Sequence, residues 1–329
     1  MKISDIISWL RFPLSICVVL RHLTTGMGDS VNAINKEFLN ILQYSFSSFA
    51  VPSFFIISGY LFFYNIESFD KDIYLNKIKK RIKSLLIPYF FWNTFYFFVY
   101  YLSYRIEGGH FGVDFSLLGF ITGMWACPGV TTPIYFAFWF IRELIVMCII
   151  SPLFYYGINR MGKWFVLSVF VIYTITWNNH SFSVNPAAPI CFCLGAYISL
   201  KKIKNMPTNK LYQILFLLFT LFLLTTNYLH QYMHVLGSLS MFILGQHLST
   251  RIKIHPFFSN SSFSIFALHV FFLTICYHIL LKIFIIDNTF IGIIVILLSF
   301  MFTIILCCLS YYLVNKLFPK LSIIIWGGH

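Results

Sequence analysis

Long apolar segments recur about ten times along this chain, and short basic clusters separate them. A membrane-spanning helix needs about 20 predominantly apolar residues. Only 10% of the 329 residues are charged, whereas soluble domains carry about 25%. We therefore expect an all-α, polytopic integral membrane protein with about ten transmembrane helices in one bundle. The candidate spans lie at about residues 6–23, 46–65, 84–104, 135–156, 163–179, 185–200, 211–229, 235–250, 262–282 and 289–314.

Lysine and arginine are distributed unevenly between the connections. With the N-terminus inside, most of them fall in inner connections, and the outer ones hold only Lys36, Arg105 and Lys282. By the positive-inside rule, both termini are expected in the cytoplasm. The formal charge of +13 then reflects topology, so we expect no nucleic-acid partner. We also expect a single transmembrane domain over residues 1–329, with no soluble domain appended.

The first apolar run contains charged side chains. In "LRFPLSICVVLRHL", Arg11 and His22 are eleven positions apart. This separation is about three helical turns, which places both side chains on one face about 16 Å apart. The two residues can line one cavity from opposite ends, with Arg11 in the cytoplasmic half. The alternatives are a snorkelling anchor for Arg11 and an interfacial, hydrogen-bonded histidine for His22.

A second pair of charges lies in "FAFWFIRELIVMCII", a third of the way into the fourth span. Charges at that depth cost several kcal/mol unless they meet partners or water. Arg142 and Glu143 are adjacent and diverge by about 100° on a helix, so each is expected to need a partner on another helix. They mark either a functional cavity or interhelical ion pairs that fix the bundle.

Basic residues are concentrated in "NKIKKRIKSLLIPYF" (76–90), just before the third span on the cytoplasmic side. Lys80, Arg81 and Lys83 belong to this cluster. The cluster indicates either topology and attraction to anionic lipid or a cradle for a phosphorylated cytoplasmic ligand, for which Lys and Arg are natural donors.

No metal site is expected. Cys191 and Cys193 form only a C-x-C pattern inside an apolar run, without further ligands at zinc spacing. His230 and His234 lie at i, i+4, with no obvious third ligand.

Taken together, these features resemble the acyltransferase family 3 membrane proteins, which O-acylate cell-surface glycans. The motifs that carry the resemblance occur in a fixed order and cover essentially the whole chain. They are R-x10-H from Arg11 to His22, "FFIISGYL" with Ser58, Gly59 and Tyr60, the basic stretch followed by "LLIPYFFW", "FWFIRELI" around Trp139, and "SFSIFALHVFFL" with His269. One departure is that the family's R-x-x-R pattern appears here as Lys80 and Lys83 around Arg81, and lysine lacks the bidentate fork of arginine.

The resemblance implies transfer of an acyl group, usually acetyl, from cytoplasmic acyl-CoA to a glycan or lipid-linked saccharide on the outer side of the inner membrane. The donor would be bound by Arg11, Lys80, Arg81, Lys83, Ser58 and Tyr60. His22 would act as a general base or as a transient acyl acceptor. Arg142, or the hydroxyls of Ser58 and Tyr60, would stabilise the oxyanion.

The sequence leaves several alternatives open. Glu143 either orients His22 or pairs with Arg142, and His269 is either functional or a packed histidine. The acceptor would be recognised by the loops at about 24–45 and 105–134. A secondary transporter that uses Arg142, Glu143 and His22 is the main rival function, although no paired repeats are visible. A non-catalytic membrane scaffold is a second rival, and the oligomeric state is open.

Overall fold

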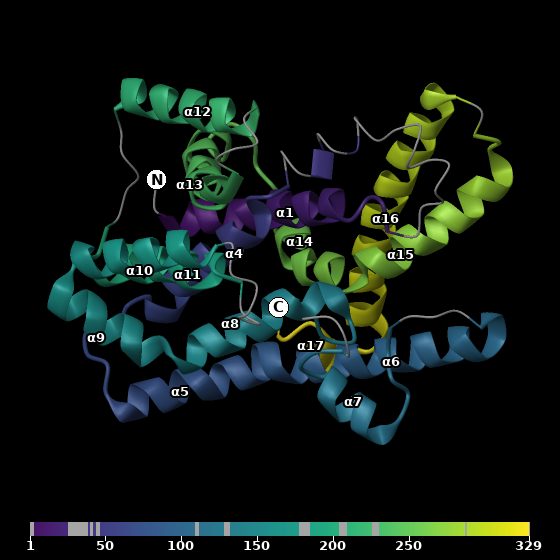
Figure 1. Ribbon diagram of the computed structural model, residues 1–329, viewed down its shortest axis with the longest axis horizontal. Coiled ribbons are helices and arrows are strands. Elements are labelled where there is room, and N and C mark those ends of the chain that lie inside the picture. The colour runs from purple at the N-terminus through teal and green to yellow at the C-terminus, as the bar shows by residue number, and fades with distance from the viewer. Residues whose placement is uncertain are drawn as a thin grey trace.

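A computed structural model describes residues 3–25, 39, 42–43, 47–108, 112–127, 132–177, 185–203, 209–225, 230–286 and 288–328. Within these residues every regular element is a helix (Figure 1). A helix lies on each predicted span: α1 (Ile3–Arg21), α4 (Ala50–Phe63), α6 (Ile87–Glu107), α8 (Trp139–Ile149), α10 (Lys163–Thr176), α11 (Ala187–Leu200), α12 (Lys210–Thr225), α13 (His230–Leu248), α15 (Ser262–Ile283) and α16 (Thr289–Leu317).

Shorter elements connect these helices, and most of them were not expected from the sequence. They are α5 (Lys71–Arg81), the π-helix η2 (Ile82–Leu86), α7 (Leu117–Gly123), the 3₁₀-helix η3 (Phe136–Phe138), α9 (Ser151–Met161), α14 (Pro256–Asn260) and α17 (Pro319–Ile325). The helix α7 lies in the long connection at 105–134. One side of α7 packs on α6 through the rings of Phe97 and Phe120, whose centroids are 4.8 Å apart, and its Leu117 and Leu118 are exposed.

Among the described residues, four helices are long and apolar enough to cross a membrane: Ile3–Arg21, Lys71–Ile106, Ser262–Ile283 and Thr289–Leu317. The bent pair Phe136–Ile149 and Ser151–Met161 would make a fifth span. Other apolar helices, such as Ala50–Phe63, are shorter than a full span. The all-helical, multi-pass architecture is therefore confirmed, whereas the count of ten spans and the cytoplasmic termini stay predictions.

The basic cluster continues into the third span as one long helix with a π-helical segment. Asp70 caps the start of α5 by accepting a hydrogen bond from the backbone N–H of Ile73 at 2.8 Å. The π-helix η2 comes directly before Pro88, near the start of α6. Proline has no N–H to donate, and the wider i→i+5 turns give the backbone a way around that gap. Figure 1 shows α5 and α6 in line along the lower edge of the molecule.

The fourth predicted span, 135–156, is not one straight helix. The helices α8 and α9 meet at Ile150 with a bend of 56°. Pro152 lies in the first turn of α9, where its missing N–H does little harm, and it cannot continue the hydrogen bonding of α8. Tyr74 of α5 donates a hydrogen bond to the carbonyl of Ile149 at 2.9 Å. The bend therefore supplies a backbone acceptor that fastens the basic helix to the bundle.

The helices α4 and α11 pack closely against each other, and glycine makes this close approach possible. Gly59 of α4 lies against the backbone carbonyl of Phe192, and Gly195 of α11 lies against the carbonyl of Ile56. A Cβ atom on either glycine would overlap these carbonyls. Small residues at such crossings let helix backbones approach each other in membranes. Gly59 of the "SGY" motif therefore acts in packing.

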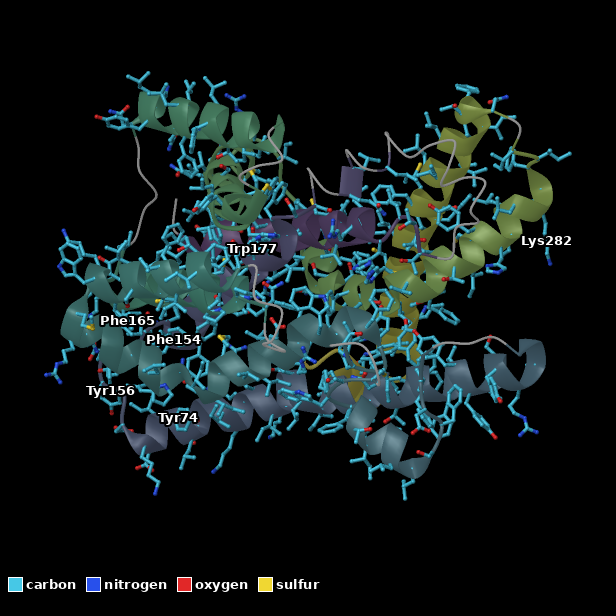
Figure 2. All side chains as sticks on the ribbon, viewed as in Figure 1. Tyr74, Phe154, Tyr156, Phe165, Trp177 and Lys282 are labelled. Atoms are coloured by element: carbon cyan, nitrogen blue, oxygen red, sulfur yellow. The ribbon has the colours of Figure 1, made fainter. Side chains whose placement is uncertain are left out.

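The basic helix and the end of α15 lie far apart. Figure 2 places Tyr74 and Tyr156 at one end of the long axis and Lys282 at the other. The basic helix α5 contains Tyr74, whereas Lys282, assigned from the sequence to an outer segment, lies in the last turn of α15. Which of these ends faces the cytoplasm stays a prediction.

The α4–α11 contact leads to a prediction about stability. Gly195→Ala adds one methyl group against the carbonyl of Ile56, and overpacking of this kind costs about 1–3 kcal/mol. The variant is expected to unfold at a lower temperature in detergent than the unaltered protein. Val171→Ile is the control, because it adds one methyl group to an exposed side chain of α10. Equal unfolding temperatures for the two variants would contradict the packing role of Gly195.

Candidate active site

A cavity of about 140 Å³ lies where α1, α4, α5, α8, α14 and α15 meet. Its polar lining residues are Arg11, Ser58, Arg81, Ser259, Asn260 and Ser262, and the rest of its wall is apolar. At about 30 Å³ per water molecule, this space is of the size of a phosphate group with some solvent, or of a narrow chain. The cavity brings together residues that the sequence separates by up to 255 positions.

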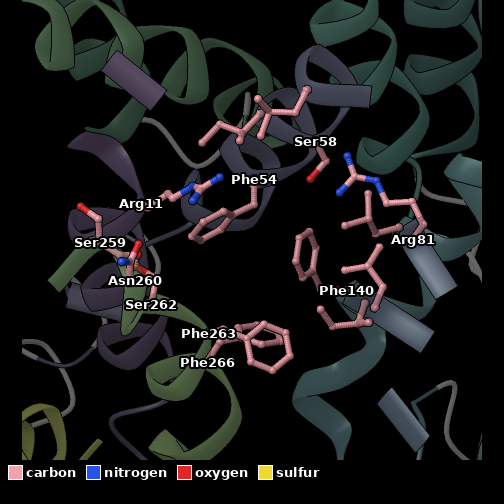
Figure 3. A pocket seen from close by; sticks show the side chains of 15 residues that line it. Arg11, Phe54, Ser58, Arg81, Phe140, Ser259, Asn260, Ser262, Phe263 and Phe266 are labelled. Carbon is pink, nitrogen blue, oxygen red and sulfur yellow. Dashed lines mark hydrogen bonds between the residues drawn. The ribbon is translucent and has the colours of Figure 1, made fainter. Parts of the chain in front are cut away.

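Two arginines share this cavity without a carboxylate. Figure 3 shows Arg11 and Arg81 on opposite walls, with the hydroxyl of Ser58 between them. Arg81 also lies over the ring of Phe62, 5.9 Å from its centroid. The single ion pair found in the described residues is formed elsewhere, by Arg142 and Glu143. Like charges held together with no acidic partner favour an anionic ligand.

The other two cluster residues predicted to bind the donor face away from the cavity. Lys80 and Lys83 are exposed, and neither belongs to the lining. Arg81 lies at the end of α5, and on a helix surface neighbouring residues point in different directions. The basic cluster therefore contributes one guanidinium to the cavity, and the two lysines face outward.

The "SGY" motif serves two different cavities. Ser58 lines the arginine cavity, whereas Tyr60 lines a separate cavity of about 560 Å³ together with Tyr64 and Lys202. Residues two apart on an α-helix point in nearly opposite directions. The two hydroxyls therefore line different cavities, and their assignment to one donor site stays a prediction.

His22 lies one residue beyond the end of α1, not inside the helix as the span 6–23 implied. Its backbone N–H donates to the carbonyl of Val19 in a tighter turn, at 3.0 Å. The half-buried imidazole lies between two rings, 5.3 Å from Phe136 and 5.1 Å from His269, measured between centroids. Arg11 lies next to residues of α14 and α15, and His22 lies next to His269 of α15. Both side chains are therefore on the side of the molecule where α1 faces α15.

The cavity that holds Arg11 does not extend to His22 among the described residues. The cavity lining includes Phe266 but neither His22 nor His269. Phe266 packs against Phe138 with centroids 5.5 Å apart and against Phe140 with centroids 5.6 Å apart. The Phe266 ring is 6.3 Å from the ring of His269. An aromatic cluster therefore lies next to both the arginine cavity and the histidine pair.

Arg142 and Glu143 contact each other, which the helical geometry had argued against. Their side chains are 3% exposed, and Nη2 of Arg142 is 3.6 Å from Oε1 of Glu143. Each also has a partner elsewhere, because Arg142 donates to the carbonyl of Trp125 at 2.7 Å and Glu143 accepts from the backbone N–H of Asn185 at 2.9 Å. Arg142 lies over the Trp125 ring as well, 5.1 Å from its centroid.

These contacts direct the pair away from the histidines. Arg142 lines a third cavity, between α6, α7 and α8, and not the one that holds Arg11. The partners of Glu143 described above do not include His22. The pair instead ties the segment after α7 and the start of α11 to α8, which is the interhelical anchoring considered from the sequence.

Sequence reasoning missed the polar corner formed by Ser259, Asn260 and Ser262. The Ser259 hydroxyl donates to the carbonyl of Ser8 at 3.0 Å and so joins α14 to α1. The exposed Asn260 lines the cavity close to Arg11 (Figure 3). The run "SNSSFS" between two apolar segments was the available signal, because polar side chains concentrated at a helix junction mark a turn that faces a polar space.

The other candidate residues lie in packed or hydrogen-bonded surroundings that indicate structural roles. Trp139 begins α8 and is half-buried against the core. His234 contacts the carbonyl of Ser48 at 2.9 Å. Among the described residues no group of three or more His, Cys, Asp or Glu side chains is arranged to hold a metal ion. Much of the predicted acceptor loops, residues 26–38, 40–41, 44–46, 109–111 and 128–131, lies outside the described residues.

The fold and the site thus define a multi-pass membrane protein with a dibasic cavity and a histidine pair. The acyltransferase domain family matches residues 5–312, and the chain belongs to this family, as its motifs predicted. It is similar to the succinoglycan biosynthesis protein ExoH of Rhizobium meliloti (strain 1021), with 27% identity over 154 residues. That match covers 46% of this chain and 40% of the relative's length. No solved structure matches the chain.

The buried ion pair leads to a prediction. Arg142→Gln and Glu143→Gln each leave one buried charge without its partner, which costs about 3–5 kcal/mol. Both single variants are expected to unfold at clearly lower temperatures in detergent. The double variant should be less destabilised than the sum of the two single changes, because it removes both charges. Arg105→Gln, at an exposed position, is the control. Single variants as stable as Arg105→Gln would contradict the anchoring role.

Proposed function

We propose that this protein is an O-acyltransferase of the inner membrane. It transfers an acyl group, most simply acetyl, from cytoplasmic acyl-CoA to a hydroxyl of a surface or lipid-linked glycan on the outer side. The family supports the reaction type, and the similarity to a succinoglycan biosynthesis protein, ExoH, supports a polysaccharide context. The observation that carries the proposal is the cavity in which Arg11 and Arg81 have no carboxylate partner among the described residues.

The donor's chemistry fits this cavity. Acyl-CoA carries phosphates at one end and a thin pantetheine arm at the other. Arginine binds phosphate through a planar fork of N–H donors, and the hydroxyl of Ser58 adds a further donor between the two forks. A cavity of about 140 Å³ is too small for the whole coenzyme. The phosphates therefore occupy the dibasic cavity while the rest of the nucleotide stays at its cytoplasmic mouth.

His22 performs the proton transfer in this proposal. One nitrogen of its ring takes the proton from the acceptor hydroxyl as the hydroxyl oxygen bonds to the thioester carbonyl carbon. The carbon–sulfur bond breaks, and the CoA thiolate leaves with the proton from His22. The alternative route, in which His22 takes the acyl group first and then passes it to the hydroxyl, uses the same nitrogen. Arg142 is not assigned to the oxyanion, because its cavity is a different one.

The acyl group must pass the aromatic cluster to reach His22. Phe266 lines the donor cavity and lies next to His269. In this proposal the ring of Phe266 moves aside to let the acyl group pass from the arginine cavity toward His22. A closed aromatic cluster also keeps water from the thioester before the acceptor arrives.

The transporter alternative receives less support from the geometry. It required Arg142, Glu143 and His22 to share one pathway. Instead, Arg142 and Glu143 engage each other together with Trp125 and Asn185, and His22 lies beside Phe136 and His269.

Donor binding is tested by neutralising the two arginines. Arg11→Gln and Arg81→Gln are each expected to raise the KM for acetyl-CoA at least tenfold, because each removes one charged phosphate contact of about 1.5–3 kcal/mol. Steady-state transfer of radiolabelled acetyl to a glycan acceptor is the measurement. Lys79→Gln, an exposed residue of the same basic helix, is the control and should keep the wild-type KM. If the two arginine variants also keep the wild-type KM for acetyl-CoA, the arginine cavity is not the donor site.

The chemical role of His22 is tested separately. His22→Ala is expected to lower transfer by at least about 100-fold, the usual contribution of a general base. Binding of CoA, measured by calorimetry on the purified protein, should stay unchanged because His22 does not line the arginine cavity. Full acetyl transfer by a correctly inserted His22→Ala variant would show that the assignment of this residue is wrong.

A further inference from the structure

A second histidine, His269, lies beside His22 and has a fixed protonation pattern. His269 is completely buried in α15. Its Nδ1 atom lies 3.0 Å from the carbonyl of Ile265 and 2.9 Å from that of Phe266. Carbonyl oxygens only accept hydrogen bonds, so Nδ1 must carry the proton. In a neutral imidazole the other nitrogen, Nε2, is then an acceptor.

That acceptor is left without a partner. Nε2 of His269 is buried and forms no hydrogen bond in the part of the chain that the structure describes. Buried polar atoms in proteins are nearly always paired, and an exception calls for an explanation. Because Nδ1 is turned to the backbone of α15, Nε2 is directed away from that backbone.

A partner of suitable chemistry, His22, lies beside His269. The two ring centroids are 5.1 Å apart with planes inclined at 41°, a separation that one N–H···N hydrogen bond between imidazoles can span. The other rings beside the pair, Phe136 and Phe266, offer no N–H or O–H donor. A change of the χ2 angle of His22 turns a ring N–H toward Nε2 of His269.

We propose that His269 is a positioning residue for His22. Its Nε2 accepts a hydrogen bond from one ring nitrogen of His22, which fixes the tautomer and leaves the other ring nitrogen as the base that faces the acceptor hydroxyl. The inference rests on the proposed function, and it deepens the assignment of that site. A fixed tautomer is what a general-base histidine requires, and a carboxylate commonly supplies it. In this protein the neutral imidazole of His269 takes the role of that carboxylate.

The proton balance of the step agrees with this role. The hydroxyl proton passes to the free nitrogen of His22, whose ring becomes positively charged. Its second N–H, which already points at Nε2 of His269, then makes a charge-assisted hydrogen bond that is stronger than the neutral one. The CoA thiolate removes the transferred proton, and both rings return to their starting state. His269 keeps its Nδ1 proton throughout.

Two amide substitutions of His269 distinguish a role in positioning His22 from a role in packing α15. In His269→Gln the amide oxygen reaches the place of Nε2, so an acceptor remains for His22. In His269→Asn the amide nitrogen takes the place of Nδ1 and still donates to the carbonyls of Ile265 and Phe266, but the acceptor is lost. The expected result is transfer within about tenfold of wild type for Gln. For Asn, kcat should be lowered at least about 100-fold with an unchanged KM for acetyl-CoA.

His278 provides matched controls on the same helix. Its Nδ1 also contacts the carbonyl four residues earlier, that of Thr274, at 2.8 Å, but the side chain is exposed. His278→Gln and His278→Asn should both keep wild-type transfer. If His269→Asn is active and His269→Gln is not, the residue only anchors its own helix, and the proposal is overturned. Activity in both His269 variants overturns it as well.

A readout without substrate covers the case in which both His269 variants lose activity. In ¹⁵N-histidine NMR of the detergent-solubilised protein, with the His22 signal assigned from the His22→Ala variant, wild type should show one fixed tautomer of His22. His269→Asn should show a mixture of tautomers. An unchanged His22 signal in that variant overturns the proposal. Wild-type protein that transfers no acyl group would contradict the proposed function instead, and the NMR comparison would still test the histidine pair.

Discussion

Charge in an apolar interior must meet an opposite charge, a hydrogen-bonding group or a ligand, and this constraint accounts for how the charged residues of this protein are placed. The described residues meet this requirement in two ways. Arg142 and Glu143 satisfy each other and take up backbone groups from two further segments, which makes them part of the scaffold. Arg11 and Arg81 share a cavity that has no carboxylate in its described lining. The first arrangement joins two opposite charges within the chain, whereas we propose that an anion from outside the chain completes the second.

The scaffold around this cavity explains why it can exist between helices. Gly59 and Gly195 bring α4 against α11 without intervening side chains, so the neighbouring face of α4 is free to present Ser58 to the cavity. The π-helix before Pro88 carries the basic helix into the bundle without a break in the chain. The cavity and the histidine pair are therefore assembled from segments distant in sequence, and α1 connects them by carrying Arg11 and ending just before His22.

Periodicity and charge were sufficient to predict the all-helical membrane architecture, and the resemblance of the ordered motifs predicted the family, because both depend on patterns local to the chain. Side-chain direction was harder to predict. That Arg81 and not Lys80 enters the cavity depends on the rotation of α5 about its axis, which packing against α8 decides. Helical geometry alone predicts that Ser58 and Tyr60 point in different directions. The "SGY" motif was nevertheless treated as a single donor-binding unit. The contact between Arg142 and Glu143 depends on long side chains that bend toward each other, which ideal helix angles do not describe.

Sidedness is the central claim, since the arginine cavity is assigned to the cytoplasmic donor and His22 to the outer acceptor. It is tested most directly in proteoliposomes whose protein orientation is determined by protease cleavage of a terminal tag. Radiolabelled acetyl-CoA is placed on one side only and a glycan acceptor on the other. Label should enter the glycan when the donor is on the side of the basic helix α5, and not when the two compounds are exchanged. Equal labelling in both arrangements would contradict the account.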